Sequence, residues 1–112
     1  MTEAEEKIFQ EAILKWGAEG QIEMIIEEMA ELTVAIQHWK RGRVDTEKIA
    51  DELSDVGIMV DQLSLMLDPD PEASKRRYLR YREMKINRLD DRIADRGRPL
   101  RESTSVRGDW GA

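Results

Sequence analysis

The chain of 112 residues contains no cysteine. This absence excludes disulfide bonds, thiolate chemistry and zinc sites built on cysteine, and it is typical of a reducing compartment. Long apolar runs are also missing, so no segment approaches the length that a membrane-spanning helix needs. The opening MTEAEEKIFQEAILKW is acidic and amphipathic, without the basic start and apolar stretch of a signal peptide. We therefore expect a cytoplasmic protein with no membrane partner.

Proline is scarce, and no segment alternates β-branched with polar residues. The three prolines are Pro69, Pro71 and Pro99. This pattern predicts an all-α protein with few helix breaks. The expected helices are Thr2 to about Trp16, about Gln21 to Arg41, Asp45 or Thr46 to about Leu67, and Pro71 to about Ala94 or Asp95. Residues 96–112 are rich in Gly, Ser and Arg, so we expect an all-α domain over residues 1–95 and a flexible basic tail after it.

The two middle helices, residues 21–41 and 45–67, carry apolar side chains around most of their circumference. A short turn at Gly42 would fold them into a central antiparallel hairpin, and with the two outer helices they would form a four-helix bundle. Helices this apolar need more cover than the outer helices of one chain supply. We therefore expect oligomerisation to complete the bundle, giving a homodimer or a homotetramer.

Charge is distributed unevenly along the chain. Residues 1–70 hold 17 acidic and 6 basic side chains, a net charge of −11, whereas residues 71–112 hold 7 acidic and 12 basic ones, a net charge of +5. Such asymmetry is found in proteins with a nucleic-acid-binding tail and in proteins whose two halves meet each other.

Carboxylates occur inside the apolar middle helices, in the segments IIEEMAEL and DELSDV. Glu28 and Glu31 are three residues apart and share a helix face, as do Glu52 and Asp55. Since Glu31 and Glu52 lie equally far from the turn, and so do Glu28 and Asp55, an antiparallel hairpin would gather all four. Four bare anions in one small volume repel one another strongly. All-oxygen ligation suits hard cations, so the sequence predicts a site for Mg²⁺, with Mn²⁺ as a substitute.

Two other interpretations of these carboxylates compete with a magnesium site. Acidic pairs at three-residue spacing are common on solvated helix faces, but two pairs mirrored about one turn and bordered by apolar residues favour a metal site. A di-iron carboxylate bundle would need Glu-x-x-His pairs. The single histidine, His38, lies outside both pairs, so iron is disfavoured.

Residues 10 to 95 resemble the all-α nucleotide pyrophosphohydrolases, specifically the single-domain MazG-like proteins, many of them encoded by phages. The resemblance rests on Glu27-Glu28-Met-Ala-Glu31 followed by Glu52-Leu-Ser-Asp55. It implies hydrolysis of a nucleoside triphosphate to monophosphate and pyrophosphate, in the host cytoplasm if the chain is phage-encoded, and we expect the substrate to be a deoxynucleotide. It further implies Mg²⁺ at Glu28, Glu31, Glu52 and Asp55, and sites completed across subunits.

Metal-dependent hydrolysis needs a group that removes a proton from the attacking water. Glu28 or Glu31 is a candidate for this catalytic role, and the sequence does not choose between them. Glu27 lies about a quarter-turn away and is expected to be solvated or outside the metal ligands.

Substrate contacts are expected from cations and from a flat side chain. Lys48 precedes Glu52 by one turn, where a phosphate contact and a simple ion pair with Glu52 are both open. Lys85 and Arg88 lie on one basic stripe of the last helix and could hold the outgoing pyrophosphate, and the resemblance also favours a Lys-x-x-Arg pair there. Trp16 could bind the base, with Gln21 as a polar contact, although core packing is as good an explanation for both.

Two further function classes compete with the enzyme. The chain could be a non-catalytic helical oligomer, a scaffold or interaction module whose carboxylates merely line a surface. A nucleic-acid-binding role for the basic half is disfavoured by the acidic front half and by the lack of aromatics among the arginines.

Overall fold

The structure is a computed structural model that describes residues 1–95. Four helices and no strand occur in this part of the chain, which confirms the all-α expectation. They are α1 (Glu3–Trp16), α2 (Ala18–Lys40), α3 (Thr46–Leu63) and α4 (Pro71–Ala94). Residues Met1–Arg77 form one compact unit, and a second unit begins at Tyr78, inside α4. The tail predicted for residues 96–112 lies outside the described residues.

Local capping explains where three of the helices begin. Thr2 accepts a hydrogen bond from the Glu5 amide at 3.1 Å, and the Glu5 carboxylate accepts one from the Thr2 amide at 2.7 Å, which completes the expected capping box. Asp45 caps α3 by accepting from the Lys48 amide at 3.2 Å. Before α4, Asp70 accepts from the Glu72 amide at 3.2 Å, with Pro71 at the first helical position.

The second helix begins three residues earlier than the expected Gln21. Only Gly17 interrupts the chain, with φ at +85°, and α2 starts at Ala18. Gly17 still donates to the Ile13 carbonyl at 2.8 Å while its own carbonyl accepts from the Gln21 amide at 3.1 Å. One residue with positive φ, a conformation natural to glycine, is therefore enough to redirect the chain, and Gly20 continues the helix.

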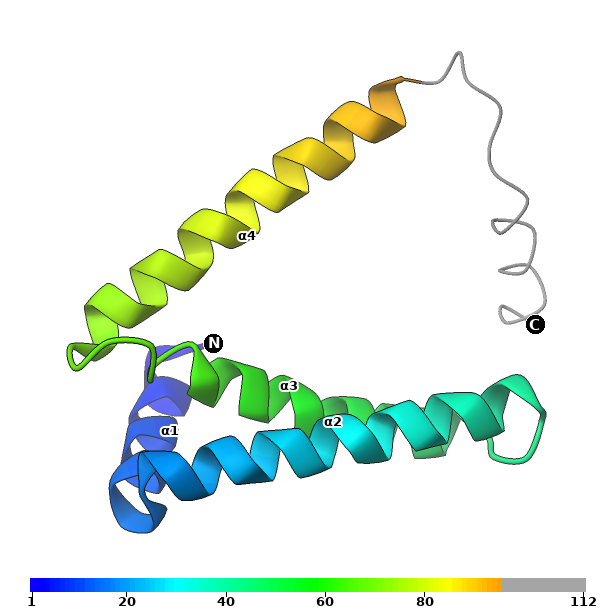
Figure 1. Ribbon diagram of the computed structural model, residues 1–112, viewed down its shortest axis with the longest axis horizontal. Helices are drawn as coiled ribbons and strands as arrows, with labels where there is room; N and C mark the ends of the chain where they lie inside the picture. The colour runs from blue at the N-terminus through cyan, green and yellow to red at the C-terminus, as the bar shows by residue number, and fades with distance from the viewer. Residues whose placement is uncertain (96–112) are drawn as a thin grey trace. The chain divides into compact units, whose positions relative to one another are not determined.

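The central hairpin is present as expected (Figure 1). Helices α2 and α3 lie side by side and antiparallel, joined by a turn in which Gly42 has φ at +70°. Helix α1 lies at the opposite end of the hairpin from this turn and contacts both helices. The carboxylates of α2 and α3 are thus placed in the middle of a paired element.

Helix α3 ends at Leu63, four residues before the expected Leu67. The buried Ser74 hydroxyl donates to the Ser64 carbonyl at 2.6 Å and accepts from the Leu67 amide at 2.7 Å. These bonds join the end of α3 to the first turn of α4 and hold the intervening chain out of helical conformation. The prediction was wrong because the contact comes from residues ten positions apart, which local patterns do not show.

The hydrophobic core of the described chain is small. Its buried apolar residues are Phe9, Ile25, Ala35, Met59 and Leu65. On α2 a stripe of large apolar side chains stays exposed, with Ile22, Ile26 and Met29 at 41%, 56% and 52% of their full exposure. Leu53 on α3 is also 56% exposed. A stripe of this kind on one chain is typical of a surface that another protein surface covers.

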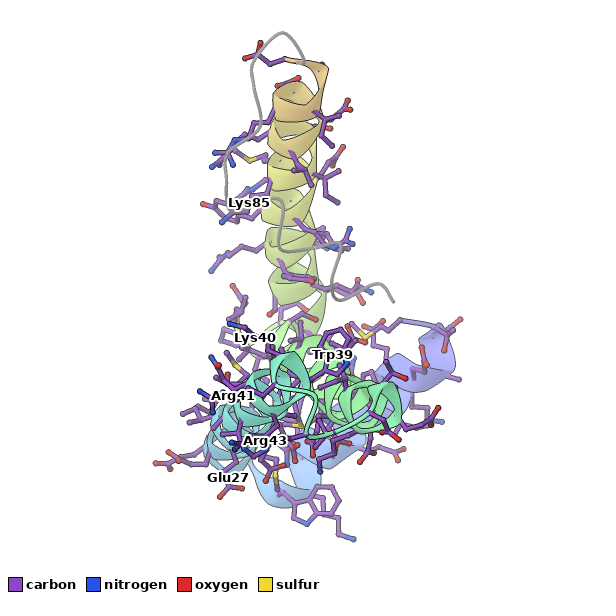
Figure 2. All side chains as sticks on the ribbon, turned by 90° about the vertical axis from the view of Figure 1, so that its right-hand side faces the viewer. Glu27, Trp39, Lys40, Arg41, Arg43 and Lys85 are labelled. Carbon is purple, nitrogen blue, oxygen red and sulfur yellow. The ribbon has the colours of Figure 1, made fainter. Side chains whose placement is uncertain are left out.

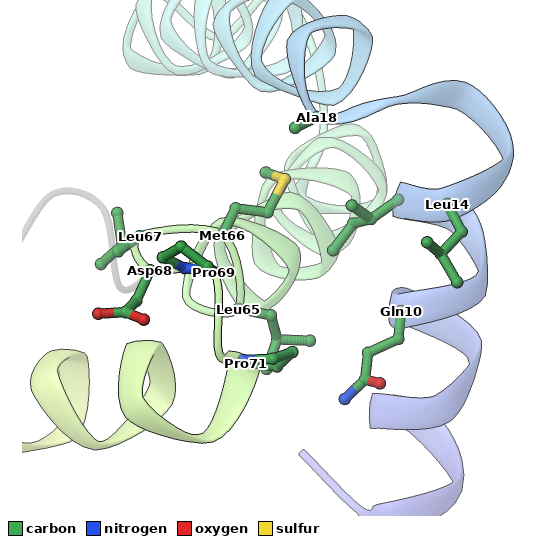
Figure 3. Close-up of a pocket in the computed structure, with 10 residues that line it drawn as sticks. Gln10, Leu14, Ala18, Leu65, Met66, Leu67, Asp68, Pro69 and Pro71 are labelled. Carbon is green, nitrogen blue, oxygen red and sulfur yellow. The ribbon is translucent and has the colours of Figure 1, made fainter.

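A cavity of about 590 Å³ lies between the second half of α1 and the segment that joins α3 to α4 (Figure 3). Leu14, Leu65 and Met66 make most of this wall apolar. Its one carboxylate, on Asp68, is already engaged, since it accepts from the Asp70 amide at 3.0 Å and pairs with Arg77 at 3.5 Å. None of the predicted metal ligands lines this cavity.

Candidate metal centre

Three of the four predicted ligands come together across the hairpin. Glu28, Glu31 and Glu52 each offer a carboxylate oxygen within 4.8 Å of the other two. Helix α2 supplies the first two, one turn apart, and α3 supplies the third. The mirrored spacing about Gly42 therefore does bring Glu31 and Glu52 together, as the sequence predicts.

Two of these carboxylates have an oxygen that is buried without a protein partner. Among the described residues, Glu28 Oε2 and Glu52 Oε2 are shielded from solvent and accept no hydrogen bond; Gln62 Oε1 is the third buried side-chain atom in this condition. Glu52 as a whole is only 7% exposed. A buried carboxylate oxygen without a donor is costly, and a cation supplies what is missing. The donor set therefore fits a hard metal ion.

The electrostatics of Glu28 reflect the same crowding. Burial raises the pKa of its carboxyl above the ordinary value of 4.5, and the negative charges of Glu31, Asp55 and Glu52 raise it further. Each of these effects disfavours the ionised form. A bound dication would reverse the balance by favouring the carboxylate.

Asp55 lies outside the group of three, and it is exposed. It is nevertheless close enough for its charge to act on the Glu28 carboxyl, which agrees with the expected placement of these two residues across the hairpin. Its role as a fourth ligand stays a prediction.

Lys48 forms an ion pair with Glu52, with Nζ 2.9 Å from Oε1. The simpler of the two expectations for Lys48 is therefore confirmed, and the phosphate contact stays a prediction. The pair occupies one oxygen of Glu52 and leaves the other, the buried Oε2, without a partner. The hydrogen bond and the charge of Glu52 raise the pKa of Lys48 above 10.5, so the lysine remains charged.

The two residues predicted to bind the base, Trp16 and Gln21, lie in different environments. Trp16 ends α1 and is 62% exposed, with the Lys15 ammonium 5.3 Å from its ring centroid. Gln21 is buried, at 6% exposure, in the first turns of α2. The burial of Gln21 is what core packing predicts, whereas the Trp16 ring is largely exposed at the end of α1. Their contacts with a base stay a prediction.

The remaining candidates are exposed. Glu27 is exposed on α2 and outside the group of three, as expected for a solvated residue. Figure 2 views the turn end of the hairpin, where Arg41 and Arg43 lie. Lys85 and Arg88 belong to the second unit, where Lys85 lines a groove on α4. Their phosphate contacts stay a prediction.

A second cavity, of about 570 Å³, adjoins the carboxylates. Glu31, Glu52 and Lys48 line one part of it, and His38 lines another. The rest of the wall consists of small apolar side chains, namely Ala30, Val34, Ala35 and Val44. The sequence interpretation missed this cavity and considered His38 only as an absent iron ligand. The available signal was spacing, because His38 follows Glu31 by two helical turns and so shares its face.

No helix among residues 1–95 combines the length and the apolarity that crossing a bilayer requires. Comparisons of the chain with protein-family models, with curated proteins and with solved structures gave no significant match.

Proposed function

We propose that the protein is a Mg²⁺-dependent nucleoside triphosphate pyrophosphohydrolase, which cleaves a (deoxy)nucleoside triphosphate to monophosphate and pyrophosphate. The observation that carries the proposal is the group of Glu28, Glu31 and Glu52 oxygens within 4.8 Å, with buried unpartnered oxygens on two of them. Mg²⁺ is bound in proteins by a few carboxylates together with substrate phosphates, which matches this donor set. The sequence resemblance to MazG-like proteins supports the same reaction.

Glu28, Glu31, Glu52 and Asp55 would hold the metal. When bound, Mg²⁺ would polarise the phosphoryl oxygens, lower the pKa of a water molecule and offset the repulsion between triphosphate and carboxylates. Glu28 or Glu31 takes the proton from the attacking water. The water oxygen then bonds to phosphorus at the α–β anhydride, the bridging P–O bond breaks, and pyrophosphate leaves.

The leaving pyrophosphate needs cations beyond the metal ligands. Lys48 lies at the edge of the cluster and keeps its charge through its contact with Glu52. Lys85 and Arg88 are proposed as further phosphate contacts, from the same subunit or from a partner. Arginine offers a forked donor and lysine a point charge, and both suit β- and γ-phosphate oxygens.

We propose that the working form is a homodimer or a homotetramer. The exposed apolar stripe of Ile22, Ile26 and Met29 supports this, because three adjacent large side chains on a paired hairpin offer a surface for a second copy. The same stripe is what a non-catalytic helical scaffold would use, so it also favours the alternative function.

One reaction tests the proposed chemistry. The full chain is incubated with Mg²⁺ and each of the common NTPs and dNTPs, and the products are separated by ion-exchange chromatography. We expect monophosphate and pyrophosphate in equal amounts, and none when EDTA replaces Mg²⁺. Formation of diphosphate and orthophosphate would overturn the assigned reaction.

Calorimetric titration with Mn²⁺ separates the enzyme from the scaffold. The enzyme should bind Mn²⁺ stoichiometrically, and Glu52→Gln should weaken this binding. A scaffold should show no stoichiometric site, and its oligomeric state should be the same with and without the ion.

A further inference from the structure

The last helix carries a stripe of large apolar side chains, and it continues without a break to Ala94 (Figure 1). Leu79, Ile86 and Ile93 recur every seven residues. Leu89 follows Ile86 by three residues, so it lies on the same side of the helix. We name these four residues the α4 stripe. They are 46% to 55% exposed. A seven-residue apolar repeat is the pattern by which one helix packs along another.

The two flanks of the α4 stripe carry opposite charges. At about 100° per residue, Lys85 and Arg92 lie along one flank, and Glu83 and Asp90 lie along the other. All four side chains are exposed, and none forms an ion pair within the part of the chain that the structure describes. The helix therefore has a basic edge and an acidic edge on the two sides of one apolar surface.

These edges determine how two copies of the helix would pair. In a parallel pair, the basic edge of each helix faces the acidic edge of the other. Lys85, which precedes Ile86, then lies opposite Asp90 of the partner subunit, which follows Leu89. In an antiparallel pair each edge faces its own copy, so that like charges meet on both sides. Charge complementarity therefore favours the parallel arrangement.

Arg82 interrupts the stripe, because it lies on the same side of α4 between Leu79 and Ile86. In the parallel pair its neighbour is Glu83 of the partner subunit, which offsets the charge, while its aliphatic part covers apolar surface. A polar residue at an inner position costs stability and fixes the alignment of the helices. Since the stripe is also short, such a pair adds to a larger assembly and is not stable alone.

We propose that the α4 stripe binds the α4 stripe of a second copy, as a parallel pair of helices. This contact is separate from the one proposed for the exposed residues of α2, and it does not depend on the proposed reaction. Arg88 lies on the outer side of α4 and Lys85 at the edge of the pair, so neither is enclosed by the contact.

The lack of native cysteine makes the alignment directly measurable. Leu79→Cys, Ile86→Cys and Ile93→Cys are prepared singly in the full chain and oxidised with glutathione disulfide. Covalent dimers are then quantified by non-reducing electrophoresis. In a parallel pair each of these positions meets its own copy, within the roughly 4.4–6.8 Å between Cα atoms that a disulfide bond spans. Each variant should therefore form covalent dimers about tenfold faster, or more, than the control described next.

Met84→Cys is the matched control. Met84 is 55% exposed, as the stripe residues are, but it lies on the opposite side of α4. Equal rates for the stripe variants and Met84→Cys would overturn the inference. Linking of Ile86→Cys only in a mixture with Leu89→Cys would mean an antiparallel pair, and linking only in a mixture with Ile26→Cys would place α4 on the hairpin of the second copy. Either result overturns the parallel pair.

Charge reversal tests the two edges, with Leu79→Cys as the reporter. Adding Lys85→Glu puts acidic groups opposite each other on both sides of the pair, and should slow dimer formation roughly tenfold. Adding Asp90→Lys as well should restore the rate, because the ion pair is formed again with its signs exchanged. Residues five positions apart are not neighbours on one helix, so this rescue reports a contact between copies. A double variant as slow as Lys85→Glu would overturn the proposed alignment.

Light scattering of the parent chain separates this inference from the other proposals. If the parent is a dimer or a tetramer but the stripe variants link no faster than Met84→Cys, only the α4 pair is overturned. If the parent is a monomer and no variant links, the α4 pair and the proposed assembly are both wrong. The proposed reaction is tested by its products and is independent of either result.

Discussion

At the scale of single residues, Glu28 and Glu52 hold buried carboxylate oxygens that no group in the described chain satisfies. Such groups lower stability, and they persist where a ligand or ion completes them. These two buried, unpartnered oxygens are therefore the feature that identifies the candidate metal site. It also makes the behaviour of the metal-free protein informative, because the same substitutions affect stability and activity in opposite directions.

Neutral, isosteric substitutions should separate these two effects. Glu31→Gln, Glu52→Gln and Asp55→Asn should each lower turnover by at least about 100-fold and weaken Mn²⁺ binding. Without metal, each should melt at the same or a higher temperature than the parent, since one repelling anion is gone. Enzyme assays, calorimetry and thermal melting monitored by circular dichroism measure the three quantities.

Glu27→Gln serves as the control, because Glu27 is an exposed acid on the same helix outside the cluster. It should keep the parent's activity. A cluster variant that retained full activity would not be a ligand, and one that melted much lower without metal would mark its carboxylate as structural.

At the scale of elements, the joint between α3 and α4 depends on one hydroxyl. Ser74 is fully buried and bonds both the Ser64 carbonyl and the Leu67 amide. Ser74→Ala should lower the free energy of unfolding by about 1–3 kcal/mol, because two buried backbone groups lose their partner. Urea denaturation measures the change.

Ser54→Ala is the matched control. The Ser54 hydroxyl donates to the Ala50 carbonyl at 2.7 Å on an exposed helix surface, so alanine there should be neutral or slightly stabilising. Equal losses in the two variants would show that the buried joint contributes no more than an ordinary surface hydroxyl.

A second joint between elements is the ion pair of Glu6 on α1 and Lys75 on α4, with Nζ 2.9 Å from Oε2. The hydrogen bond from Lys75 lowers the pKa of Glu6 below 4.5, and the bond to Glu6 raises the pKa of Lys75 above 10.5. The ion pair therefore stabilises the folded chain fully between the ordinary pKa values of the two groups, 4.5 for Glu6 and 10.5 for Lys75. It is lost as the pH falls through the lowered pKa of Glu6 or rises through the raised pKa of Lys75.

Glu6→Gln should accordingly lower the melting temperature near neutral pH, by the equivalent of about 1 kcal/mol or less. The difference from the parent should shrink as the pH falls below 4.5. Glu72→Gln is the control, because Glu72 also pairs with Lys75, at 3.2 Å, but within α4. A pH-independent difference for Glu6→Gln would mean that packing, not charge, joins the two helices here.

The elements also show how far the sequence could predict the structure. The starts of α1 and α3 were predictable, because Thr2 and Asp45 act on amides within three residues of themselves. The grouping of Glu31 with Glu52 was predictable from distance to the turn. The end of α3 was not, because it depends on Ser74, and neither was the cavity near His38, because its shape depends on how two helices pack.

At the scale of the whole molecule, the small core and the exposed apolar stripe on α2 predict self-association. Light scattering at micromolar concentration should give the mass of a dimer or a tetramer. Ile26→Glu should shift the mass toward the monomer, because it puts a charge into the proposed interface at a side chain that is 56% exposed in the single chain.

Ile8→Glu is the control for this substitution, since Ile8 is 61% exposed but lies on α1, outside the hairpin. It should leave the mass unchanged. A parent chain that scatters light as a monomer would contradict the assembly and any site shared between subunits.

The five buried apolar residues of the described chain have a consequence for how its stability is measured. If association supplies the missing burial, folding and assembly share one equilibrium, and the law of mass action applies to both. The melting temperature then rises with protein concentration, and dilution alone unfolds the chain. A ligand that binds the assembled form more tightly than the single chain would also raise the melting temperature, as added protein does.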